Sequence, residues 1–126
     1  MANPRGTVKP STKLSPAEIS DRLKGLPGWR LENGEGGSAI VRDYQTDGWP
    51  TTLMLVNAIG FFAEAADHHP DLAVSWGKVQ VKLSTHSAGG VTASDMELAR
   101  IIEQTALWRP RTGSALRGTT KKFVGS

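Results

Sequence analysis

The chain has 126 residues, a formal net charge of +3 and no cysteine, so we expect one domain with a sizeable core and exclude disulfides and thiolate metal sites. The longest apolar stretch, residues 53–66, is interrupted by Asn57 and Glu64 and is too short to span a bilayer, and residues 1–13 lack the apolar core of a secretory signal. We therefore expect a cytoplasmic protein that contacts no membrane.

The charge is distributed unevenly. Residues 1–14 and 106–126 carry eight basic residues and no acidic one, whereas residues 15–105 carry seven basic and twelve acidic residues. Such blocks are typical of solvated segments, and less often of arms that bind an acidic partner. We predict a disordered basic arm at 1–13, a folded domain at 14–107 and a basic extension at 108–126.

The first helix is expected to begin at Pro16. Ser15 is a favourable N-cap, and Glu18 completes a capping box with it. Gly25 and Pro27 are expected to end the helix.

Two strands should follow, at Trp29–Glu32 and Ser38–Tyr44, joined by a glycine-rich loop at Asn33–Gly37. Neither face of the second strand is cleanly apolar. Gly48 and Pro50 then break the chain before the next element.

A long helix is predicted to be capped by Thr51 or Thr52 and to run to about Ala66. Pro70 prevents its continuation. Apolar residues at helical spacing form a broad stripe, which predicts a helix packed flat on a sheet: Leu55, Ala58, Ile59, Phe61, Phe62, Ala65 and Ala66.

A second strand pair and a last helix complete the domain. Leu72, Val74 and Trp76 alternate, and a further alternating run begins at Val79 beyond a tight turn. Thr92 and Asp95 form another capping box. The apolar face of the last helix is predicted to comprise Met96, Ala99, Ile102 and Ala106.

The expected order is α-β-β-α-β-β-α. Few strand pairs are separated by a helix of crossover length, so an antiparallel sheet with the helices on one face is the natural packing. The fold class is therefore α+β.

All three histidines, His68, His69 and His86, lie in one window of the sequence. Histidine has an ordinary pKa of about 6.5 and exchanges protons near neutrality, so their grouping suggests one site. Singly, each is explained as well by a helix terminus or a strand end. A zinc shell with a carboxylate is the competing use, but adjacent histidines point apart and no HxH or HxxxH pair occurs, so we expect no metal.

The spacing in this window resembles that of the pterin-4a-carbinolamine dehydratases, also called 4a-hydroxytetrahydrobiopterin dehydratases. Weaker similarity runs from residue 14 to 104, through LPGW at 26–29. The resemblance implies a four-stranded antiparallel sheet with three helices on one side, assembled as a homodimer or homotetramer. The residues that carry it are Glu64, His68-His69-Pro70, Trp76, His86 and Asp95.

The resemblance implies a hydro-lyase that converts 4a-hydroxytetrahydropterin to quinonoid dihydropterin during tetrahydrobiopterin recycling. The pterin is the substrate, and no cofactor is needed. His68, His69 and His86 would line the pocket. We assign proton transfer to His69 and His86, and a sharing or orienting role to His68.

Five further residues are expected at or near the pterin. Glu64 could hold an imidazole in the useful tautomer. Asp95 belongs to the family pattern, although as a residue it is mainly a helix cap. Trp76 is expected in the core or the pocket wall, Trp29 at the pocket edge, and Thr85 at the amide edge of the pterin.

Two departures from the family favour a different class of function. Ser87 replaces the acidic residue that usually follows the third histidine, and the chain continues into a basic, aromatic extension. Residues expected to bind a partner there are Trp108, Arg109, Arg111, Arg117, Lys121, Lys122 and Phe123.

The alternative is a weakly active or inactive dehydratase-like scaffold that assists Rubisco assembly in the α-carboxysome through this extension. Direct nucleic-acid binding is expected to be weak and nonspecific, because the body of the chain is acidic.

Overall fold

The computed structural model describes residues 12–121 and 123–125, so most of the predicted arm at 1–13 lies outside the described residues. In chain order the elements are α1 (Pro16–Leu23), β1 (Trp29–Gly34), β2 (Gly37–Thr46), α2 (Trp49–Ala66), β3 (Asp71–Ser75), β4 (Lys78–Leu83), the short 3₁₀ helix η1 (His86–Ala88), α3 (Ala93–Ala106) and β5 (Val124–Gly125).

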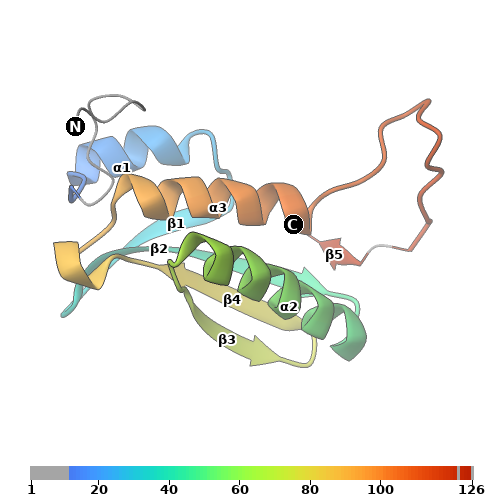
Figure 1. The fold of residues 1–126 in the computed structure, drawn as a ribbon, viewed down its shortest axis with the longest axis horizontal. Coiled ribbons are helices and arrows are strands. Elements are labelled where there is room, and N and C mark those ends of the chain that lie inside the picture. Colours follow the sequence, from blue (N-terminus) through green and yellow to red (C-terminus); the bar gives the residue numbers. More distant parts are fainter. Residues whose placement is uncertain (1–11, 122, 126) are drawn as a thin grey trace.

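The strands form one antiparallel sheet in the order β1-β2-β4-β3. The three α-helices cover one face of it, and the predicted α+β fold class is confirmed (Figure 1). The short β5 was not predicted. It pairs with β2 at Gln45 and Thr46, beyond the end of β1.

Local sequence explains where two of the helices begin. Ser15 and Glu18 form the predicted capping box of α1, and Thr92 and Asp95 form that of α3. The predicted cap of α2 is wrong, because this helix begins at Trp49 with Gly48 as its N-cap. The hydroxyl of Thr52 instead lies inside the first turn, within hydrogen-bond distance of the carbonyls of Gly48 (3.0 Å) and Trp76 (2.9 Å).

The first hairpin is tighter than predicted. The expected loop at Asn33–Gly37 is wrong, because Gly34 still pairs with Gly37 and only two residues, Glu35 and Gly36, make the turn. The second strand also runs on to Thr46, since β4 pairs with it as far as Gln45.

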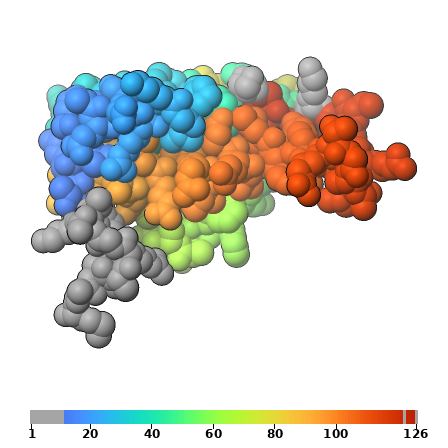
Figure 2. All heavy atoms as spheres, turned by 90° about the horizontal axis from the view of Figure 1, so that it is seen from above, coloured from blue at the N-terminus to red at the C-terminus, as the bar shows by residue number. Residues whose placement is uncertain are grey.

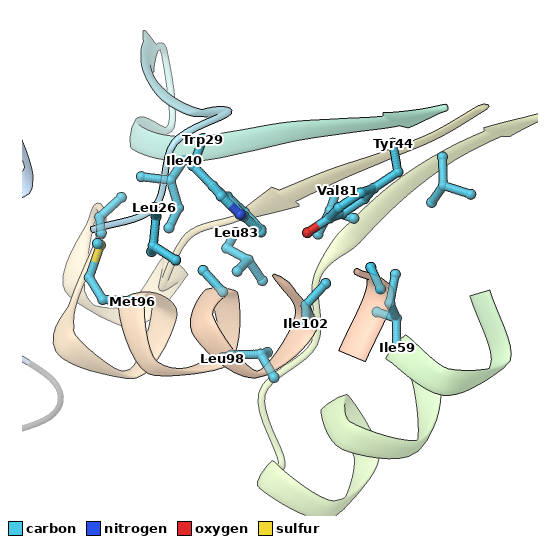
Figure 3. Packing of buried hydrophobic residues seen from close by; sticks show 14 of the residues in the cluster. Leu26, Trp29, Ile40, Tyr44, Ile59, Val81, Leu83, Met96, Leu98 and Ile102 are labelled. Carbon is cyan, nitrogen blue, oxygen red and sulfur yellow. The ribbon is translucent and has the colours of Figure 1, made fainter. Parts of the chain in front are cut away.

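The core lies between the sheet and the helices (Figure 3). The predicted apolar face of α3 is confirmed as buried. The predicted stripe on α2 is partly wrong: Leu55 and Ile59 are buried, but the ring of Phe61 is exposed. The buried face of α2 comprises Thr51, Thr52, Leu55, Ile59 and Ala63.

One polar residue fixes α3 against the sheet. The carboxylate of Glu103 accepts hydrogen bonds from the indole N–H of Trp29 (3.0 Å), the guanidinium of Arg42 (3.0 and 3.2 Å) and the hydroxyl of Tyr44 (2.6 Å). Figure 3 shows Trp29 and Tyr44 pointing from the sheet toward the helices. This network explains why the helix-facing side of β2 is not purely apolar: the buried Arg42 is paired with the partly buried Glu103.

Candidate active site

The histidine pair lies where α2 ends. Asp67 caps the helix in the left-handed conformation, with a φ of 49°, which short polar residues tolerate. The backbone N–H of His68 still donates to the carbonyl of Ala63 (3.0 Å), and β3 begins at Asp71. Both imidazoles therefore stand in the short connection between α2 and β3.

Strand pairing brings this connection close to the end of β4. Asp71 pairs with Lys82, and the same register continued backward would set His68 opposite Thr85. The structure agrees: Nε2 of His68 lies 2.5 Å from Oδ1 of Asp95, and the Thr85 hydroxyl donates to Oδ2 of the same carboxylate (2.7 Å). Three predicted site residues thus meet.

Asp95 serves two purposes. Its side chain is fully buried, and a buried carboxylate is costly unless it is hydrogen-bonded and paired. Oδ2 accepts from the backbone N–H of Thr92 (2.8 Å) as the helix cap, while Oδ1 faces His68. Thr92 also contacts the Thr85 hydroxyl (2.9 Å), so it joins the site, although its capping signal alone did not place it there.

The second imidazole has its own carboxylate. Nε2 of His69 lies 2.8 Å from Oε1 of Glu64, so the imidazole that Glu64 holds is that of His69. Both side chains are mostly exposed, at 58% and 83%. Water screens such a pair, so it adds little to the stability of the fold.

His86 is the first residue of η1 and is exposed. Its loop is held by Ser38 of β2: the hydroxyl of Ser84 donates to the Ser38 carbonyl (2.7 Å), and the N–H of Val91 donates to the Ser38 hydroxyl (3.0 Å). This role of Ser38 could not be predicted from local sequence, because Ser84 and Val91 lie far from it along the chain.

A hollow of about 410 Å³ lies beside His68, between the end of α2 and α3. The residues that line it are Ala66, Asp67, His68, Ser94, Glu97, Leu98 and Ile101. His69 and His86 are not among them, so a pocket lined by all three imidazoles stays a prediction.

The two predicted tryptophans lie elsewhere. Trp29 is in the core, 5% exposed, with its N–H donated to Glu103, so it is not at a pocket edge. Trp76 is 69% exposed in the turn after β3 and lies against Gly48, so the prediction of a core position was wrong. A role for either in binding the substrate rests on the family pattern alone.

The extension leaves α3, loops outward and returns to the sheet as β5 (Figure 1). Arg109 donates to the carbonyl of Val124 (3.1 Å), and Lys121 pairs with Asp47 (3.3 Å). Trp108, Arg111 and Arg117 are exposed, Phe123 is partly buried, and Lys122 lies outside the described residues.

Within residues 12–121 and 123–125, no group of three His, Asp or Glu side chains could hold a metal ion. No helix in that same part of the chain is long and apolar enough to cross a membrane.

The fold is α+β, and the site pairs a histidine at the end of α2 with a buried carboxylate at the start of α3. The family model for pterin 4 alpha carbinolamine dehydratase matches residues 12–105. The chain belongs to this family. The extension lies outside the matched range.

Relatives of known sequence carry the name of the same family. A protein of Aquifex aeolicus provisionally named pterin-4-alpha-carbinolamine dehydratase is 46% identical over 73% of this chain and 89% of the relative. One from Roseiflexus sp., named in the same way, is 42% identical over 75% of this chain and 97% of the relative.

Two solved structures share the fold. A transcriptional coactivator/pterin dehydratase from Brucella melitensis matches with a TM-score of 0.68 and 32% identity, over 73% of this chain and 96% of that one. A pterin dehydratase-like protein described as a RuBisCO assembly factor in the alpha-carboxysome matches with a TM-score of 0.55 and 15% identity, over 64% and 90%. At that identity the second likeness concerns the fold alone.

Proposed function

We propose that the protein dehydrates 4a-hydroxytetrahydropterin to quinonoid dihydropterin. In this reaction the C4a–O bond breaks, N5 loses its proton, the C4a=N5 bond forms and water leaves. Hydroxide is a poor leaving group, so an acid must protonate it while a base takes the N5 proton, each contributing about 10²–10⁴-fold. Family membership and the grouping of all three histidines in one window of the sequence support this chemistry.

The observation that carries the proposal is the pairing of His68 with the buried carboxylate of Asp95. A buried carboxylate that faces one ring nitrogen fixes the orientation and tautomer of an imidazole. This suits His68 to an orienting or sharing role. His69 and His86, both exposed, are then the groups that transfer protons to and from the substrate.

The test is a dehydration assay on the purified full-length protein, following the absorbance change as a 4a-carbinolamine becomes quinonoid dihydropterin. We expect a rate above the uncatalysed one, and losses of about 10²-fold or more in His69→Ala and His86→Ala. Wild-type protein that does not exceed the uncatalysed rate would refute the proposal.

We further infer a homodimer or homotetramer. Glu64 is the only charged residue among the 18 of α2. A helix so apolar on all sides is normally covered on all sides. The exposed large residues of this helix that a second copy would cover are Trp49, Leu53 and Phe61. Light scattering after size exclusion should give a multiple of 13.5 kDa. A monomer at micromolar concentration would contradict this inference.

A second candidate is a scaffold that assists the assembly of a protein such as Rubisco. Ser87 beside His86 and the extension outside the family match favour it. It predicts negligible dehydration, together with partner binding that is lost when residues 108–126 are removed.

A further inference from the structure

A second hollow, of about 280 Å³, lies where the extension meets the domain, apart from the histidines. Figure 2 shows the extension beside the end of α3, at one end of the molecule. The lining is mostly apolar and comes from α2, α3 and the extension: Thr51, Met54, Leu55, Ala58, Thr105, Ala106, Trp108, Arg109, Phe123 and Val124.

The extension wall of this hollow is fixed in place. Val124 is in the hydrophobic core, 8% exposed, and β5 pairs with β2. The carbonyl of Phe123 accepts from the N–H of Asp47 (3.0 Å), and the guanidinium of Arg109 donates to the carbonyls of Trp108 and Val124. The hollow is therefore largely preformed, which lowers the entropic cost of filling it.

Two large apolar side chains at this hollow are exposed, Met54 by 61% and Trp108 by 58%. Exposed tryptophan beside a preformed hollow is typical of binding hot spots. A volume of about 280 Å³ has room for one inserted apolar side chain.

The charged side chains of the extension are all basic. Arg109 lines the hollow, and Arg111 and Arg117 follow on the same extension, where no acidic residue occurs after Glu103. The side chains of Arg111 and Arg117 are exposed and make no ion pair with the described residues. Asp47, an acidic residue that contacts the extension, is already paired with Lys121.

We propose that this surface binds an acidic peptide segment of a partner protein, with one apolar anchor side chain inserted between Met54 and Trp108. The anchor supplies affinity, and the arginines supply charge complementarity. The proposal does not depend on dehydration by the histidine site. It gives the scaffold candidate a defined contact surface without requiring Rubisco as the partner.

The test begins by selecting binders from a phage-displayed library of random 12-residue peptides on the full-length protein. We expect recovered peptides to combine Asp and Glu with a Trp, Phe, Leu or Met. Their affinities are then measured by fluorescence anisotropy. Trp108→Ser should weaken binding at least tenfold, and the double change Arg111→Glu with Arg117→Glu should weaken it severalfold and flatten its salt dependence.

Matched controls use the same chain. Leu116→Ser removes an equally exposed apolar side chain of the extension that does not line the hollow, and Arg22→Glu with Arg100→Glu reverses two exposed arginines elsewhere. Both should bind like wild type.

The proposal is overturned if no acidic, anchor-containing peptide is enriched, or if Trp108→Ser binds such peptides as tightly as Leu116→Ser does. It is also overturned if polyuridine displaces every peptide equally well and the affinity for polyuridine is unchanged in Trp108→Ser. The extension would then recognise polyanions in general. Dehydration measured on the same variants should match wild type, so failure of this proposal and failure of the dehydratase proposal remain distinct.

Discussion

Through its carboxylate, Glu103 links α3 to residues of β1 and β2. Its side chain is only 15% exposed and accepts from Trp29, Arg42 and Tyr44. Glu103→Ala would leave the guanidinium of Arg42 buried without its carboxylate, which typically costs about 3–5 kcal/mol. Urea unfolding should show this loss. Glu97→Ala on the same helix, where the side chain is exposed, should stay within about 0.5 kcal/mol of wild type.

The same carboxylate predicts how stability depends on pH. Burial opposes the charge on Glu103, but hydrogen bonds from Arg42, Tyr44 and Trp29 outweigh it and hold its pKa below the usual 4.5. The unfolded chain therefore takes up this proton first as the pH falls. The stabilisation is full above about pH 5 and is lost as the pH falls through the folded-state pKa.

Chemical unfolding measured between pH 7 and pH 3 should show this acid loss, and Glu103→Gln should reduce it. If the slope of stability against pH below 5 is the same in wild type and Glu103→Gln, the assignment of the acid sensitivity to Glu103 is wrong.

Asp95→Asn tests the histidine–carboxylate pair. The amide keeps the size of the side chain but removes the charge that faces His68. We expect kcat for carbinolamine dehydration to fall by about 10²-fold with little change in KM, and the pH–rate profile to shift. A purely structural role for Asp95 would lower stability and leave that profile where it was.

Residue-scale prediction from sequence succeeded where the partners are close along the chain. Both capping boxes join residues that are three positions apart, so they can be recognised in the sequence: Ser15 with Glu18, and Thr92 with Asp95. The contact of Asp95 with His68 spans 27 residues, and it depends on a strand register that cannot be predicted from the local sequence. Family resemblance placed both residues in one pattern without giving the contact.

At the scale of elements, the β1–β2 hairpin supports the loop that carries His86. Gly37 has a φ of 106°, and a Cβ there would lie 2.0 Å from the carbonyl oxygen of Gly89. Gly37→Ala is therefore expected to strain the backbone, by about 1–3 kcal/mol, and to displace the loop. Hydrogen exchange at Val91, whose N–H donates to Ser38, should become faster.

The matched control is Gly36→Ala in the same turn, where a Cβ would meet nothing within 4 Å. Its amide exchange at Val91 and its free energy of unfolding should match those of wild type. Equal exchange at Val91 in both variants would show that the hairpin does not hold this loop.

Element order was predictable because Pro, Gly and hydrophobic period mark it in the sequence. The rotation of α2 was not: its apolar residues surround the helix, so the stripe could not distinguish the buried Leu55 and Ile59 from the exposed Phe61. The two-residue β5 carries too little pattern to be recognised, and only its pairing with Gln45 and Thr46 identifies it.

At the scale of the whole molecule, the extension completes the domain at the end opposite the histidines. The hollow beside His68 is lined from the end of α2, whereas the hollow beside Trp108 is lined from its beginning. The two candidate sites therefore lie at opposite ends of α2. Changes at one end should act on the other only through stability.

Removing residues 108–126 tests this arrangement. The truncated chain loses Val124 from the core and Phe123 from its edge, and it exposes part of α2 and the free edge of β2 at Gln45 and Thr46. Burying a side chain such as Val or Phe contributes about 1.5–3 kcal/mol, so we expect a loss of about 2–4 kcal/mol in urea unfolding. Val124→Ser in the full chain should reproduce part of that loss, and Leu116→Ser should not.

Because the contacts of His68 with Asp95 and of His69 with Glu64 involve no residue of the extension, any dehydration per folded molecule should persist. A truncated protein as stable as the full chain would mean that β5 contributes nothing to the fold, and the fixed wall of the second hollow would lose its support.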